Sequence, residues 1–148
     1  MLLRNFDRAA QSSCGVGYIL GYHGDPFNKN YGFSVVSDRG YGGDNCGEFT
    51  FAHELGHNMG GHHDTETEDG GYGAYTYSRG YRKTLAANSG FATVMAYTQS
   101  PQVRVGYFSN PRLSLCLSQP CGEVDQADNA RGLTEAATAL AGLVAAIP

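Results

Sequence analysis

A single run of twelve residues constrains this chain more than any other feature. Residues 53–64 read His-Glu-Leu-Gly-His-Asn-Met-Gly-Gly-His-His-Asp. On a helix, His53 and His57 project from one face about one turn apart, so both imidazoles can bind a single cation. Glu54 lies on the same turn. The preceding residues contain few helix breakers and can bury one side, and we expect this helix to start near residue 48.

The spacing of the remaining motif residues predicts a catalytic Zn²⁺ site. A third ligand on the next helical turn would give tetrahedral zinc a poor angle, so the chain must leave the helix. Gly60 has no Cβ and can adopt a positive φ, which would provide the bend and let His63 reach the metal. Three imidazoles leave the fourth zinc position open to water, as in catalytic sites. We therefore expect His53, His57 and His63 to bind one zinc ion and Glu54 to act as general base.

Three non-catalytic interpretations of the motif compete with this one. They are a histidine-rich surface loop, a metal-scavenging tract and a structural zinc clip. The catalytic interpretation is favoured because the further fixed positions of the extended motif are also occupied, by Gly60, His63 and Asp64. The other histidines are not expected to bind the metal: His62 should point away from it, and His23 lies in a turn-rich loop typical of the solvated surface.

A second motif follows a connection rich in glycine and tyrosine. Residues 93–97 read Thr-Val-Met-Ala-Tyr. An extended zinc motif followed by such a methionine turn resembles the metzincin clan of zinc metalloendopeptidases. The resemblance implies an α+β catalytic domain with a mixed sheet, an antiparallel edge strand, an active-site helix and a C-terminal helix. It also implies a polypeptide substrate, and a Met95 that packs beneath the zinc-binding imidazoles.

Two residues point to different families within this clan. Asp64, directly after the third histidine, resembles the reprolysin or adamalysin type, in which this carboxylate holds neighbouring backbone. Tyr97 is similar to the tyrosine of astacins and serralysins, which touches the metal or steadies the oxyanion. We assign Tyr97 a supporting catalytic role, with packing in the wall of the site as the alternative. With residues 107–111 and 127–131, the pattern is most like bacterial reprolysin-like peptidases.

The resemblance also places the substrate. An extended peptide would add a strand along residues 16–20 by main-chain hydrogen bonds. Residues 98–107 resemble the segment that walls the pocket for the residue following the scissile bond. The resemblance covers about residues 13–147, and family domains carry further strands and helices before the edge strand. We therefore expect the sheet to be truncated and the domain to lack its first part.

Composition and charge agree with one globular domain and exclude several partners. The 148 residues are 41% hydrophobic and 16% charged, with 21 glycines that indicate many turns. A net charge of −4 without a cluster of lysine or arginine gives no indication of nucleic acid or an anionic membrane as partner. The apolar run 136–147 is too short to span a bilayer.

The four cysteines indicate disulfide bonds. They lack the paired spacing of a zinc knuckle or a redox dithiol. We prefer Cys14–Cys46 and Cys116–Cys121 among three possible pairings, because the first pair flanks two candidate strands and the second can close a small loop; four free thiols are the alternative. Disulfides indicate an oxidising compartment, so the protein is expected to be secreted or periplasmic. The first residues are no signal peptide, and secretion would need an upstream segment.

Local patterns predict the remaining elements. Residues 15–20 and 31–36 read as strands, and residues 65–92 as loops with a short hairpin. A helix over residues 127–147 would be capped by Asp128 or Asn129. Its expected apolar stripe consists of Leu133, Ala137, Leu140, Val144 and Ile147.

Three alternatives to a peptidase remain. They are a zinc-stabilised binding module, an inert truncated domain, and an enzyme that hydrolyses a substrate other than a peptide. The presence of Glu54 argues against the first, since a non-catalytic relative would be free to lose it. The sequence does not specify the cleavage preference, an accessory calcium ion or the oligomeric state.

Overall fold

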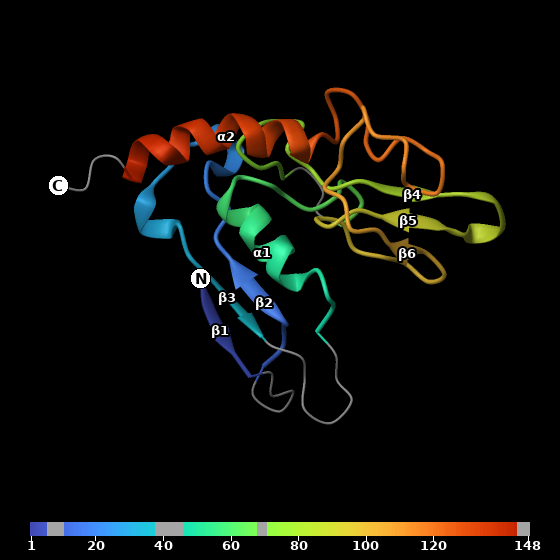
Figure 1. The fold of residues 1–148 in the computed structure, drawn as a ribbon, viewed down its shortest axis with the longest axis horizontal. Coiled ribbons are helices and arrows are strands. Elements are labelled where there is room, and N and C mark those ends of the chain that lie inside the picture. The colour runs from blue at the N-terminus through green and yellow to red at the C-terminus, as the bar shows by residue number, and fades with distance from the viewer. Residues whose placement is uncertain (6–10, 38–45, 68–70, 145–148) are drawn as a thin grey trace.

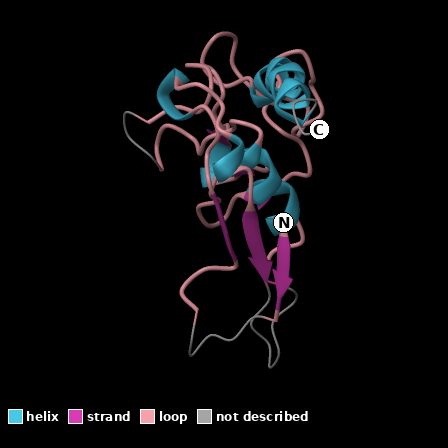
Figure 2. Cartoon of the chain, turned by 90° about the vertical axis from the view of Figure 1, so that its left-hand side faces the viewer, coloured by secondary structure: helices cyan, strands magenta, loops and turns pink. Residues whose placement is uncertain are grey.

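In the part of the chain that the structure describes, two small sheets and two α-helices form an α+β fold, as expected (Figure 1). The computed structural model describes residues 1–5, 11–37, 46–67 and 71–144. The first helix, α1, lies beside the first sheet, and the C-terminal helix, α2, crosses one side of the molecule (Figure 1). Figure 2 shows the strands of the first sheet extending away from the helices.

The first sheet is mixed and has the strand order β1-β3-β2. β1 (Leu2–Arg4) is parallel to β3 (Ser34–Ser37), and β2 (Gly15–Gly17) is antiparallel to it, with Val16 opposite Val35. β2 is therefore the antiparallel edge strand that the sequence predicted. β1 was not predicted, because three residues with exposed Leu2 and Leu3 carry no alternating pattern.

Both predicted strands of this sheet are shorter than expected. The chain leaves the sheet after Gly17, and two short 3₁₀ helices, η1 (Tyr22–Gly24) and η2 (Lys29–Tyr31), occupy the connection. The start of the predicted strand 31–36 is wrong for this reason. The Asn28 side chain accepts a hydrogen bond from the Asn30 backbone N–H at 3.0 Å, which favours a turn over extended backbone.

Helix α1 (Thr50–Asn58) packs against β2 and β3. It begins two residues later than predicted, because Gly47 starts a turn whose carbonyl accepts hydrogen bonds from the Thr50 N–H and hydroxyl, at 2.9 and 2.7 Å. At its other end, the Asn58 amide donates to the carbonyls of Tyr18 and Phe33, both at 3.0 Å. These bonds tie the end of the helix to the chain where it leaves β2 and where it enters β3.

The second sheet contains the hairpin predicted within residues 65–92. β4 (Arg82–Thr84) and β5 (Gly90–Ala92) are antiparallel and joined by η3 (Ala86–Asn88). β6 (Val103–Arg104) adds to β5 in parallel. Phe91 is fully buried between this sheet and the Cys116–Cys121 bridge, where the core of this half lies.

Both preferred disulfides are confirmed. Cys14–Cys46 has a Cα–Cα distance of 5.3 Å and ties the start of β2 to the segment that enters α1. Cys116–Cys121, at 5.2 Å, closes a small loop after the second sheet. No helix in the described part of the chain is long and apolar enough to cross a membrane.

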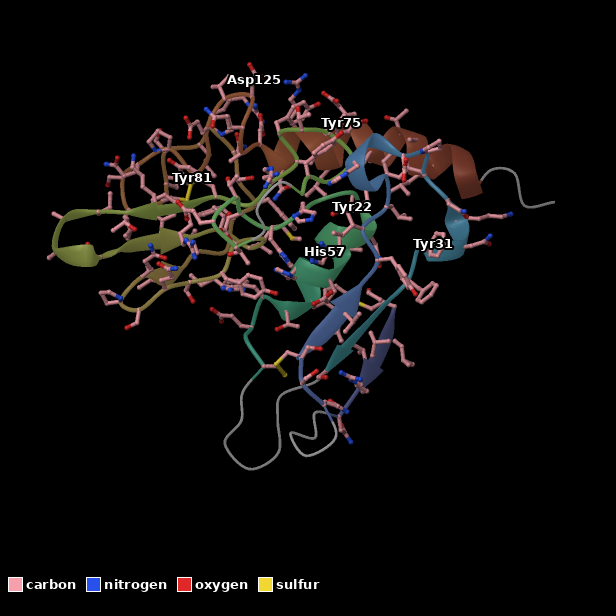
Figure 3. All side chains as sticks on the ribbon, turned by 180° about the vertical axis from the view of Figure 1, so that it is seen from behind. Tyr22, Tyr31, His57, Tyr75, Tyr81 and Asp125 are labelled. Atoms are coloured by element: carbon pink, nitrogen blue, oxygen red, sulfur yellow. A yellow bond between two sulfur atoms is a disulfide. The ribbon has the colours of Figure 1, made fainter. Side chains whose placement is uncertain are left out.

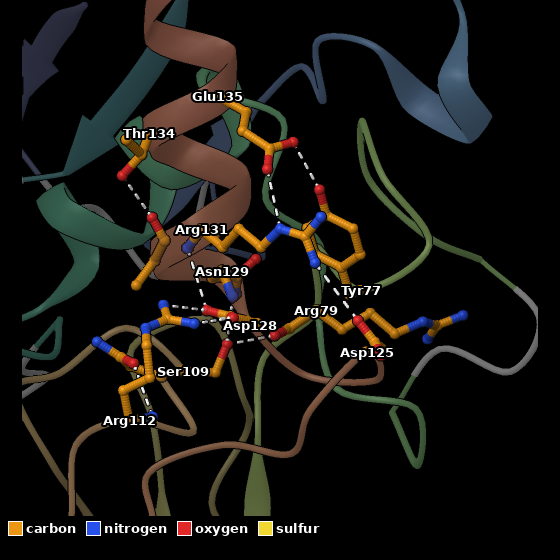
Figure 4. Close-up of polar contacts among 12 residues, drawn as sticks. Tyr77, Arg79, Ser109, Arg112, Asp125, Asp128, Asn129, Arg131, Thr134 and Glu135 are labelled. Carbon is orange, nitrogen blue, oxygen red and sulfur yellow. Dashed lines mark hydrogen bonds and ion pairs between the residues drawn. The ribbon is translucent and has the colours of Figure 1, made fainter.

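Helix α2 (Asn129–Val144) begins at an aspartate cap. Asp128 Oδ1 accepts a hydrogen bond from the Arg131 N–H at 3.1 Å, and both carboxylate oxygens bind Arg112 (Figure 4). Of the two predicted caps, Asp128 therefore has this role. Residues 145–147 of the predicted helix lie outside the described residues.

The predicted apolar stripe of α2 is only partly right. Leu133 and Leu140 are half-buried, but Ala137 is exposed. The buried face carries Asn129, Gly132 and Ala136 instead. A Cβ on Gly132 would clash with Ser78, so the helix can pack close to the segment around Ser78 only with small residues on this face. The size of the side chains, and not their hydrophobicity, therefore decides which face is buried. The side chains of Val144 and Ile147 lie outside those that the structure describes.

Candidate metal centre

The three predicted zinc ligands converge. His53 and His57 project from α1, and His63 approaches from the chain beyond its end. His63 Nε2 lies 3.1 Å from His53 Nε2 and 3.0 Å from His57 Nε2. A tetrahedral ion with bonds of 2.0–2.1 Å would separate its ligand atoms by about 3.3 Å, so these nitrogens fit an ion of the size of zinc. Among the described residues, they form the group able to hold a metal.

Backbone carbonyls orient two of these imidazoles. His53 Nδ1 donates to the Val94 carbonyl at 2.8 Å, and His57 Nδ1 donates to the Gly61 carbonyl at 2.9 Å. A carbonyl only accepts, so each Nδ1 carries the proton and each Nε2 presents its lone pair to the centre. Such outer hydrogen bonds also fix the rotation of the rings.

The helix histidines are neutral at physiological pH. Burial lowers the pKa of His53 to about 4, with a smaller opposing contribution from the hydrogen bond to Val94. Burial and, to a smaller extent, the neighbouring histidines lower the pKa of His57 to about 3. A neutral imidazole is the form that binds a metal, so both rings are ready for coordination near neutral pH.

The bend after α1 occurs at the predicted glycine. Gly60 has φ +82, a left-handed conformation that side chains disfavour, and its N–H donates to the His57 carbonyl at 2.9 Å. A Cβ at this position would also lie 2.6 Å from the Cβ of Ala74. Both the backbone conformation and the packing therefore require glycine where the chain turns toward His63.

Met95 lies directly against the metal-binding helix. Its side chain is fully buried, and a Cβ on Gly56 would clash with Met95 Sδ. Gly56 stands between the two helix histidines, so the sulfur packs beneath the ligands, as the resemblance implied. The need for glycine at position 56 was missed from the sequence. Its signal was a poor helix former in the middle of the metal helix.

The buried carboxylate of Asp64 holds the methionine turn. Its Oδ2 accepts hydrogen bonds from the Tyr97 N–H at 3.1 Å and from the Thr67 hydroxyl at 2.6 Å. Its Oδ1 lies 3.4 Å from the guanidinium of Arg82. Asp64 thus binds neighbouring backbone and stays outside the metal group, as expected for this position.

Tyr97 lies at the rim of the centre. Its ring centroid is 4.8 Å from that of His63 and 5.7 Å from that of His53, and the residue is 44% exposed. The ring therefore covers the ligands while remaining accessible to a bound substrate. This position is compatible with both roles considered for Tyr97, supporting the oxyanion and packing in the wall.

Glu54 lies on α1 and faces the edge strand. A Cβ on Gly17 would lie 2.9 Å from Glu54 Oε2, and a Cβ on Gly15 would clash with the same carboxylate. The residue is 6% exposed, and burial raises its pKa to about 7. Two glycines on one face of β2 thus make room for this side chain. Sequence reasoning missed that role, although the Gly-Val-Gly alternation was its signal.

The two remaining histidines stay outside the metal group. His62 is buried and stacks on Tyr22, with ring centroids 5.6 Å apart. His23 is exposed, as expected, and stacks between Tyr22 and Tyr72 at 4.1 and 4.7 Å. Figure 3 shows His57 on α1 and Tyr22 in the connection after β2.

Comparison with known proteins gives a consistent assignment. Residues 1–127 match the metallo-peptidase family M12B, reprolysin-like. A peptidyl-Asp metalloendopeptidase of Pseudomonas aeruginosa is 36% identical over 87% of this chain and 23% of its own length. One of Stenotrophomonas maltophilia (strain K279a) is 38% identical over 64% of the chain and 22% of its own length.

The chain spans about a quarter of the length of these curated relatives. No solved structure matches it. The family match covers α1, the three histidines, the methionine turn and both sheets, which are the elements that build the candidate centre. The chain belongs to the M12B reprolysin-like metallopeptidase family.

Proposed function

We propose that this chain is a zinc-dependent endopeptidase in which His53, His57 and His63 bind the metal and Glu54 is the general base. The observation that carries the proposal is the convergence of three Nε2 atoms. Two of them belong to α1, the helix that also carries the buried carboxylate of Glu54. An all-imidazole ligand set with carbonyl-oriented rings suits Zn²⁺. When bound, the ion would supply a Lewis acid for water and for the substrate carbonyl.

Glu54 would move the proton in this reaction. It follows His53 directly on α1, and its carboxylate is confined between the helix and the glycines of β2. From this position it would take a proton from the attacking water and deliver it to the departing amine. Tyr97, at the rim, would support the oxyanion that forms from the carbonyl.

The substrate would bind as an extended polypeptide along β2. Among the described residues, this strand pairs with β3 on one side only, and Val16 is 59% exposed. A peptide can therefore add to the free edge by main-chain hydrogen bonds. Since the relatives are peptidyl-Asp metalloendopeptidases, we propose that an aspartate adjoins the bond that is cleaved.

Such an enzyme would act outside the reducing cytosol. The described part of the chain contains two disulfides, one at the entrance to the metal helix and one behind the second sheet. Disulfides persist in secreted and periplasmic proteins. We therefore propose a secreted or periplasmic location.

Replacement of Glu54 by Gln tests the mechanism. The variant should bind zinc like the native chain, measured by elemental analysis, while its kcat for an aspartate-containing peptide falls by about 10²–10⁴-fold. Glu123→Gln, an exposed position with the same loss of charge, is the matched control and should keep full activity. Undiminished cleavage by Glu54→Gln would sink the mechanism. Zinc binding without cleavage by the native chain would favour the binding-module alternative.

A further inference from the structure

A cavity lies between the start of α1, the first sheet and β6. Its volume is about 870 Å³. β6 contributes Arg104, the start of α1 contributes Phe49 and Thr50, and the first sheet contributes Arg4 and Ser37. The cavity is large enough for an amino-acid side chain with its hydration, and none of its lining residues has a role in the reaction proposed above.

The β6 side of this cavity is held next to the metal centre. Phe49 stands four residues before His53, so it occupies the same helix face one turn earlier. A Cβ on Gly106 would lie 3.0 Å from the Phe49 ring, so the chain after β6 packs on this face. Val94 then connects the two, because its N–H donates to the Tyr107 carbonyl at 2.9 Å and its carbonyl binds His53.

Arg104 brings a positive charge to this place. Within the described part of the chain, its guanidinium makes no hydrogen bond and no ion pair, whereas Arg82 in the same sheet binds Asp64 and Glu66 at 3.4 and 2.7 Å. Burial lowers the pKa of Arg104, while Tyr97 and Asp64 raise it.

The other charged groups around the cavity leave this cation available. Arg4 donates to Ser37 Oγ at 3.0 Å and to the Ser13 carbonyl at 3.2 Å, so it is already engaged. Glu48, the acidic residue in the lining, is exposed to solvent and forms no ion pair with Arg104. A partly buried guanidinium that makes no direct ion pair is costly, since Asp64 acts on Arg104 only from beyond ion-pair distance, and a ligand carboxylate would reduce that cost.

We propose that Arg104 is the residue that selects an aspartate immediately after the scissile bond, by pairing its guanidinium with the carboxylate of that side chain. The inference rests on the proposed function and assigns its specificity to one side chain. A guanidinium presents two parallel N–H donors that match the two oxygens of a carboxylate. An asparagine side chain is neutral and has only one acceptor oxygen, so it cannot replace aspartate in this pair. Arg104 lies in the segment 98–107, which the family resemblance places against the residue following the cleaved bond.

The experiment compares peptides that differ only in having Asp, Asn or Ala after the cleaved bond. For the zinc-loaded native chain, we expect kcat/KM to favour Asp over Asn by about 30-fold or more, the loss that follows removal of one partner of a desolvated charge pair. In Arg104→Gln this preference should disappear, while cleavage of the Ala peptide stays within about threefold. Arg104→Met, which keeps the apolar stem, should give the same result even where the Gln variant folds poorly.

Peptide binding separates this inference from the proposed function. Fluorescence anisotropy of labelled Asp and Asn peptides on the zinc-loaded Glu54→Gln chain needs no turnover. Asp-selective binding that is lost on adding Arg104→Gln supports Arg104 even if the native chain cleaves nothing. Lys83→Gln, which removes a cation from β4 of the same sheet, is the control and should keep the preference. An equal response to Asp and Asn in the native chain, or a preference that survives in either Arg104 variant, overturns the assignment.

Discussion

The two sides of the metal centre are built differently. We define the helix region as β1, β2, β3 and α1, and the Met-turn region as residues 77–127. In the Met-turn region Phe91, Met95 and Cys116 are completely buried, whereas in the helix region Leu3 and Val16 are 66% and 59% exposed. The Met-turn region thus has a densely packed core. The helix region, which contains the proposed substrate-binding strand β2, depends instead on a disulfide and on the contacts of α1. The ligands lie where the two regions meet.

The largest effect is expected from a cavity in the Met-turn region. Met95→Ala should lower the free energy of unfolding by about 2–5 kcal/mol, because it removes a fully buried side chain that supports α1. The exposed counterpart, Leu3→Ala in the helix region, should change it by no more than about 0.5 kcal/mol. Denaturant unfolding of both variants checks the contrast. Similar losses would mean that the two regions share one core after all.

Removal of zinc should affect both regions together. His53 belongs to the helix region but is oriented by the Val94 carbonyl of the Met-turn region. At a free zinc concentration of 100 times Kd, the metal should stabilise the fold by about 2.7 kcal/mol. After chelation, hydrogen exchange should accelerate in α1 and also in residues 93–97. The disulfide-closed loop 116–121 serves as internal reference, and acceleration confined to α1 would break the proposed coupling.

Gly17→Ala should lower both activity and stability within the helix region. The new methyl group would press on Glu54 Oε2 and displace the carboxylate, since the backbone at Gly17 has no need of a positive φ. We expect a loss of about 10²-fold in kcat, as for an angstrom-scale misplacement of a catalytic group. The unfolding free energy should fall by about 1–3 kcal/mol, because the same methyl group would also lie 3.0 Å from the Glu54 carbonyl oxygen and 3.3 Å from the His57 Cβ, so kcat is compared on folded protein only.

Gly47→Ala is the matched control for this substitution. A Cβ there would meet only Thr50 Oγ1, at an ordinary 3.9 Å, and activity should remain. Full activity in Gly17→Ala would show that Glu54 has room to move and that the glycines of β2 have another purpose.

The metal motif could be predicted because its geometry is local. The helical period brings His53 and His57 to one face, and Gly60 turns the chain within three residues. Three glycines have roles that could not be predicted, because each role depends on a contact between segments about 40 residues apart; they are Gly15, Gly17 and Gly56. The presence of a glycine in the sequence does not predict which side chain will pack into the space left by its missing Cβ.

The same limit explains two other differences. The buried face of α2 was assigned to apolar residues, but a Cβ on Gly132 would clash with Ser78, and Ser109 Oγ accepts a hydrogen bond from the Asn129 backbone N–H at 2.8 Å, so the helix lies too close for large side chains there. Likewise, the sequence does not distinguish Arg104 from a surface cation, and only the fold shows that it is half-buried and makes no direct ion pair among the described residues. Local patterns predict which elements form, whereas packing between them decides which side chains are functional.

The smallest effect is expected where α2 meets the Met-turn region at the surface. Glu135 accepts hydrogen bonds from the Tyr77 hydroxyl at 2.6 Å and from Arg131 at 2.9 Å (Figure 4). The bond from Tyr77, and then that from Arg131, lowers the pKa of Glu135 below its usual 4.5. A carboxyl with a lowered folded pKa stabilises the fold above its unfolded pKa, and that contribution is lost as the pH falls through the folded value.

Glu135→Gln should therefore cost at most about 0.5 kcal/mol at neutral pH, because the pair is exposed and screened by solvent. The difference in Tm from the native chain should shrink as the pH falls through the lowered folded pKa of Glu135 and vanish once the native carboxyl is also protonated. Thermal unfolding of both chains between neutral and acid pH measures this. A difference that persists in acid would mean that Glu135 acts through packing, and that surface contacts hold α2 as firmly as its buried small residues do.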